Sequence, residues 1–64
     1  MTDVSKQKAT DTAERMANSY MNLTEAIHAA MDYSYMYDEN QPGYKFWNSV
    51  RSILVDMRKT EEAR

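Results

Sequence analysis

The sequence predicts an all-α protein built as an antiparallel helical hairpin. Glycine and proline occur once each in 64 residues and stand side by side, so the rest of the chain has no helix breaker. Apolar residues recur at alternating steps of three and four, the spacing that places side chains on one face of a helix. These observations predict a single domain with a long helix over about residues 11–37, a turn over 38–43 and a second helix over about 44–62.

The first predicted helix begins at Asp11, because Asp11 and Glu14 fit the N-cap and N3 positions of a capping box. Residues 1–8 are mostly polar, and we expect them to be frayed. The stripe of small or apolar residues that follows is interrupted only by a serine and comprises Ala13, Met16, Tyr20, Leu23, Ile27, Ala30, Ser34 and Tyr37.

A break in the first helix is the alternative. Asn22 and Glu25 fit a second capping box, which would divide the chain into three helices over about 5–20, 23–37 and 44–62. We expect the unbroken helix, because nothing in the sequence obliges the chain to turn at Asn22. An unbroken helix would extend roughly 12 Å beyond the second one at a rise of about 1.5 Å per residue, so another chain would have to cover its end.

The turn signal is the pair Pro42-Gly43, which fits the central positions of a type II turn with glycine at positive φ. The connection is short, so the two helices should be antiparallel neighbours. The apolar face of the second helix consists of Phe46, Val50, Ile53 and Met57, widened by Trp47 and Leu54.

Composition excludes several classes of function. The chain has no cysteine and one histidine, which rules out disulfides and argues against a metal site. A net charge of −2 gives no basic footprint for nucleic acid, so we expect no nucleic-acid partner. No apolar run reaches the length of roughly 18 residues that a membrane span needs, and the first residues do not resemble a signal peptide. We therefore expect a cytoplasmic protein that does not bind a membrane.

No catalytic constellation can be found either. His28 could contact Asp32 across one helical turn, but a general base also needs a nucleophile and a pocket, and a two-helix hairpin provides no pocket. The sequence predicts no catalytic residues, no metal ligands and no cofactor, so we expect a protein that is not an enzyme.

The segment from Met31 to Glu39 is the most unusual part of the chain. Its tyrosines alternate along the sequence, so Tyr33 and Tyr37 share one helix face whereas Tyr35 shares another with Met31. One face at most can pack on the second helix, and tyrosine is enriched at binding hot spots. The sequence therefore predicts a partner-binding site that comprises Asp32, Tyr33, Tyr35, Tyr37, Asp38, Glu39, Tyr44 and Trp47.

Two interpretations of these tyrosines stay open. They could form a contact surface for another protein, or they could fill a monomer or dimer core, because Leu, Ile, Val and Phe together number only 8 of 64 residues. The first interpretation predicts a small protein-binding module that sterically inhibits or regulates a larger intracellular protein. Its tyrosines would supply apolar anchors and its carboxylates would engage basic residues of the target. Small accessory proteins of phages and mobile elements form such a class.

The first interpretation has three grounds: the excess of Tyr, Met and Trp, the lack of a catalytic constellation, and the uncovered end of the first helix. The second interpretation predicts a homodimeric four-helix bundle with a structural or regulatory role. Such a dimer could bind nucleic acid only weakly, and only through a basic face assembled from two copies of Arg51 and Arg58. In length and architecture alone, the hairpin resembles small dimeric four-helix-bundle regulators, and that similarity implies no function.

Overall fold

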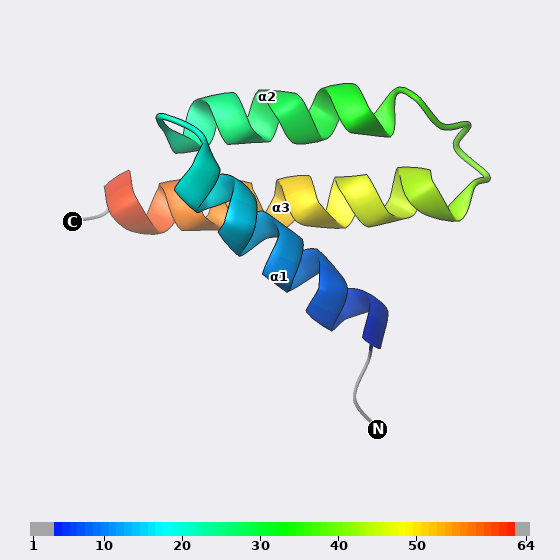
Figure 1. The fold of residues 1–64 in the computed structure, drawn as a ribbon, viewed down its shortest axis with the longest axis horizontal. Helices are drawn as coiled ribbons and strands as arrows, with labels where there is room; N and C mark the ends of the chain where they lie inside the picture. The colour runs from blue at the N-terminus through cyan, green and yellow to red at the C-terminus, as the bar shows by residue number, and fades with distance from the viewer. Residues whose placement is uncertain (1–3, 63–64) are drawn as a thin grey trace.

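The computed structural model describes residues 4–62, which form the helices α1 (Val4–Ser19), α2 (Leu23–Ser34) and α3 (Pro42–Glu62). In Figure 1, α2 and α3 lie side by side and run in opposite directions, while α1 crosses α3 obliquely. α3 is the central element, since it packs against both other helices, whereas α1 and α2 have little contact. The predicted all-α fold is confirmed, and α2 and α3 are the arms of the helical hairpin.

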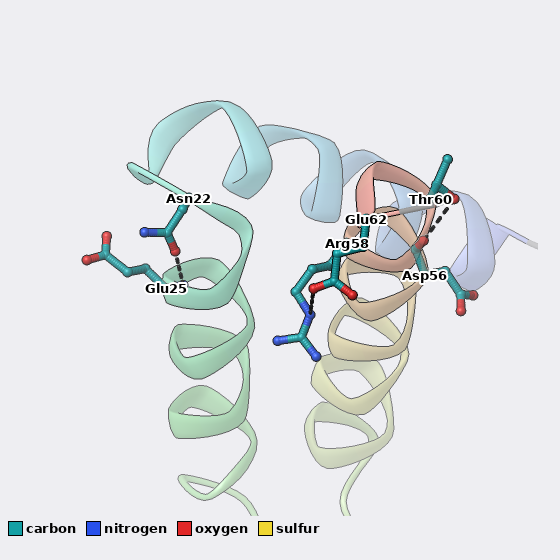
Figure 2. A network of polar contacts seen from close by, with 6 residues as sticks. All are labelled: Asn22, Glu25, Asp56, Arg58, Thr60 and Glu62. Carbon is teal, nitrogen blue, oxygen red and sulfur yellow. Dashed lines mark hydrogen bonds and ion pairs between the residues drawn. The ribbon is translucent and has the colours of Figure 1, made fainter. Parts of the chain in front are cut away.

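The prediction of one unbroken helix over 11–37 is wrong, and the alternative of a break near Asn22 is correct. Asn22 has an extended backbone (φ −151°, ψ 167°), and its Oδ1 accepts a hydrogen bond of 2.9 Å from the Glu25 N–H (Figure 2). On the other side of the break, the Ser19 hydroxyl donates to the Arg15 carbonyl oxygen at 2.8 Å. Short polar side chains therefore satisfy backbone groups on both sides of the break.

The break allows α1 to fold back across α3, which buries Ala9, Ala13 and Met16. An unbroken helix would have carried these residues away from α3 into water, so burial of apolar area favours the broken chain. The uncovered helix end expected from the sequence therefore does not exist in this fold.

α1 also begins earlier than predicted, at Val4 rather than near Asp11. Asp11 is an exposed residue inside the helix and not its N-cap. Of the segment 1–8 that we expected to be frayed, residues 4–8 are helical and residues 1–3 lie outside the described part of the chain.

The core is narrow and rich in alanine: its buried apolar residues are Ala9, Ala13, Met16, Ala26, Ile27, Ala30, Val50 and Leu54. Leu54 and Val50 are the largest side chains with no exposed area. The sequence placed Leu54 at the edge of the apolar face of the second helix, but it lies at the centre. Phe46, Ile53 and Met57 of that face are only partly buried. Alanine at four core positions lets the helices approach closely, and larger apolar side chains surround this contact.

The predicted type II turn at Pro42-Gly43 is wrong, because these residues form the first two positions of α3 and no described glycine has a positive φ. Proline suits the first position of a helix, where its missing N–H would have had no intrahelical partner. The chain reverses over residues 35–41 instead. There the Gln41 N–H donates to the Asp38 carbonyl oxygen at 2.9 Å, and Gln41 Oε1 accepts from the Asp38 N–H at 2.8 Å.

Asn22→Ala is expected to destabilise the protein by about 1 kcal/mol, because the cap of α2 is lost. Urea denaturation followed by far-UV circular dichroism measures the change. Asn18→Ala is the control, since Asn18 is exposed within α1 and alanine there improves helix propensity. Equal stability of the two variants would contradict the capping role of Asn22.

Candidate functional site

Tyr33 and Tyr37 are the tyrosines that pack back onto α3. The Tyr33 ring stacks on Trp47, with ring centroids 4.6 Å apart and an interplanar angle of 24°. Trp47 in turn meets the Phe46 ring edge to face, at 5.2 Å and 84°. Tyr37 lies against the first turn of α3, where a Cβ at Gly43 would be 2.5 Å from its Cε1 atom. A Cβ at position 43 would therefore displace the Tyr37 ring from this position.

Tyr35 and Met36 point into solvent, with 71% and 76% of their area exposed. Tyr35 continues the helical backbone of α2 as its C-cap residue, at φ −71° and ψ −12°, and its N–H donates to the Met31 carbonyl oxygen at 3.2 Å. It lies one turn after Met31, but Met31 is half-buried against the core and borders α3, whereas Tyr35 extends past this contact into solvent. The two-face interpretation of the tyrosines agrees with this arrangement: one pair packs on α3 and Tyr35 does not.

The backbone that carries these side chains is held by a series of hydrogen bonds. The N–H groups of Met36 and Tyr37 donate to the carbonyl oxygens of Tyr33 and Ser34, each at 3.2 Å. Ser34 is the buried polar residue of α2, and its hydroxyl donates to the Met31 carbonyl oxygen at 2.6 Å. The end of α2 is thus ordered, so that a partner would meet aromatic side chains on a defined backbone.

The exposed aromatic residues are accompanied by negative charge. Asp32, Asp38 and Glu39 are all exposed, and the sequence from residue 29 to residue 44 contains no Lys, Arg or His. The ion pair formed among the described residues, Arg58 with Glu62 at 3.9 Å, lies near the other end of α3 (Figure 2). We call the set Asp32, Tyr33, Tyr35, Met36, Tyr37, Asp38 and Glu39 the tyrosine surface.

Three other features of the described residues would point to a different function: a metal site, a groove lined by ionisable side chains and a membrane-spanning helix. They contain no group of three His, Cys, Asp or Glu side chains that could hold a metal ion. Two open grooves of about 560 and 300 Å³ have one carboxylate each in their lining, from Glu61 and Asp56, and neither is lined by histidine. No helix within residues 4–62 combines the length and the apolar character needed to cross a membrane.

The structure brings most of the predicted site residues together at one end of the hairpin. Six are exposed at the end of α2 and in the turn, whereas Tyr44 and Trp47 are half-buried in α3. Trp47 stacks against the Tyr33 ring from the side of α3 and is not itself an exposed residue.

Two exposed methionines were missing from the predicted site. Met36 belongs to the tyrosine surface, and Met21, 92% exposed, lies far from it between α1 and α2. Helical periodicity could not find either, because each stands just outside a helix.

No protein-family model matches the chain, and neither a curated protein nor a solved structure is significantly similar to it. The functional argument therefore depends on the tyrosine surface and its surroundings.

Proposed function

We propose that this chain is a small non-enzymatic module that binds a larger intracellular protein through the tyrosine surface and regulates it by occupying part of its surface. One observation carries the proposal. Within the described residues the exposed large hydrophobic side chains are Met21 and four that lie together in the segment 33–37. Exposed apolar residues that stand alone are normal, whereas a concentration of exposed apolar area at one end of a molecule is typical of a binding site.

The type of side chain supports a protein partner. Tyrosine contributes a large contact area at a low cost in side-chain entropy, and its hydroxyl remains able to hydrogen-bond at the rim of an interface. A flexible thioether such as that of Met36 adapts to the shape of a partner. The carboxylates at positions 32, 38 and 39 would steer the module toward a positively charged surface.

One of the three grounds for this function in the sequence no longer holds. The break at Asn22 folds α1 onto α3, so there is no bare helix end that needs a partner. The aromatic excess now supports the proposal in a more specific way, because the aromatic residues are concentrated at one end of the hairpin.

The test is affinity capture from a lysate of the source organism with tagged wild-type protein and two variants. Tyr35→Ala should reduce retention of a stoichiometric partner by about 30-fold or more, the effect of losing one hot-spot tyrosine. Met21→Ala is the matched control, because Met21 is even more exposed but lies at the other end of α2. Circular dichroism of each variant shows that folding is unchanged.

Equal capture by wild type and Tyr35→Ala would refute the proposal. Recovery of nothing but further copies of the chain would favour the homodimeric four-helix bundle instead. Retention at high salt distinguishes apolar anchoring from a purely electrostatic association, which screening weakens.

A further inference from the structure

The aromatic stack at the end of the hairpin is open on one side. Trp47 covers one face of the Tyr33 ring and is itself supported by the edge-to-face contact with Phe46. Tyr33 nevertheless keeps 42% of its area exposed, so the part of the residue that Trp47 does not cover is accessible to a further planar group. A third layer on Tyr33 would continue a stack whose inner members are already fixed on α3.

Three kinds of planar group could form that layer: an aromatic side chain, a nucleobase or a guanidinium. The charge of the surroundings discriminates among them. Asp32 directly precedes Tyr33, and Asp38 and Glu39 follow in the turn, whereas the nearest basic residues to Trp47 along α3 are Lys45 and Arg51, so that the three carboxylates outnumber the two bases. These carboxylates repel the phosphates that accompany a nucleobase and give an aromatic ring no advantage, whereas they attract a cation.

We infer that the target presents an arginine-rich segment to the tyrosine surface, with a guanidinium stacked on the outer face of Tyr33. The inference rests on the proposed function and specifies its partner. Arginine fits better than lysine, because a guanidinium is planar and stacks on the face of an aromatic ring, whereas the carboxylates attract both cations alike. Tyr35, 71% exposed, offers a second ring to the same segment.

The experiment uses hexa-arginine and hexa-lysine peptides as probes of equal charge, titrated into the wild-type protein at low ionic strength. Isothermal titration calorimetry measures the two affinities. We expect hexa-arginine to bind about three- to fivefold more tightly, because its planar guanidinium stacks on the ring face, which an ammonium cannot do. Trp47 is the only tryptophan of the chain, so a change in its fluorescence locates the arginine peptide at the stack.

Variants separate stacking from charge. Tyr33→Leu should abolish the preference for arginine, whereas Tyr33→Phe should keep it because the ring face remains. Asp38→Asn combined with Glu39→Gln should weaken both peptides equally. Tyr20→Leu is the control, since Tyr20 lies at the junction of α1 and α2, away from the stack. The wild-type comparison does not depend on how well any variant folds.

Equal affinity of wild type for the two peptides would overturn the inference, and so would an arginine preference that survives in Tyr33→Leu. If that happens while capture of a partner still depends on Tyr35, the proposed function stands and only the arginine assignment fails. If capture is also independent of Tyr35, both proposals fail.

Discussion

Leu54→Ala is expected to remove about half of the free energy of unfolding of the protein. Leu54 has no exposed area and is one of the two largest completely buried side chains. Truncation of a buried leucine to alanine costs about 2–5 kcal/mol, through lost transfer free energy and the cavity that remains. A domain of 64 residues has a free energy of unfolding of only about 3–10 kcal/mol, so this single change removes about half of it.

Thermal denaturation followed by far-UV circular dichroism measures the effect. Val55→Ala is the matched control: it is the next residue on the same helix, it is half-buried, and its truncation should cost about 1 kcal/mol or less. A loss for Leu54→Ala no larger than that for Val55→Ala would mean that the centre of the core lies elsewhere.

The position of Leu54 illustrates what the sequence could and could not reveal. Periodicity identified which residues share a face of each helix, and most of the predicted stripe in residues 13–34 is buried. It could not identify which part of a broad apolar face points at the centre, because that depends on how α1 and α2 together cover α3. Val50 was predicted in the apolar face and is fully buried, but tertiary packing placed Leu54 beside it in preference to Ile53 and Met57, which are only partly buried.

The continuity of the first helix was the largest error. The local signal for a break was present, since Asn22 and Glu25 occupy cap and N3 positions as the three-helix alternative required. The deciding factor was burial of Ala9, Ala13 and Met16 on α3, a long-range contact that no local rule reports. The pair Pro42-Gly43 suits both a type II turn and a helix start, and the helical backbone without a positive φ at Gly43 shows that it begins α3.

The sequence could predict which segment of the chain carries the candidate site, but not which of its side chains would be exposed. Alternation along the chain separates Tyr35 from Tyr33 and Tyr37, and this division follows from helix geometry alone. Which of the two faces packs on α3 depends on the Trp47 ring and on Gly43, both distant in sequence. The exposure of Met36 depends on α2 ending at Ser34, a boundary that periodicity overestimated by three residues.

The second large expected effect is the loss of stability on enlarging an alanine in the close contact between α1 and α3. Ala13 has no exposed area and lies where α1 packs on α3. Ala13→Leu adds a branched side chain at a contact without space for it, so α1 must move away from α3, at a cost of about 1–3 kcal/mol. The free energy of unfolding from urea denaturation measures this cost.

Ala17→Leu tests whether space, rather than the leucine itself, decides the outcome. Ala17 follows one turn later on the same helix, but it is half-buried and lines the open groove of about 560 Å³ beside Met21 and Met57. Leucine can extend into that groove and cover apolar area, so this variant should be as stable as the wild type or more stable. Equal destabilisation by both substitutions would mean that α1 tolerates no added volume anywhere, whereas opposite effects would establish that α1 is held on α3 through the close approach at Ala13.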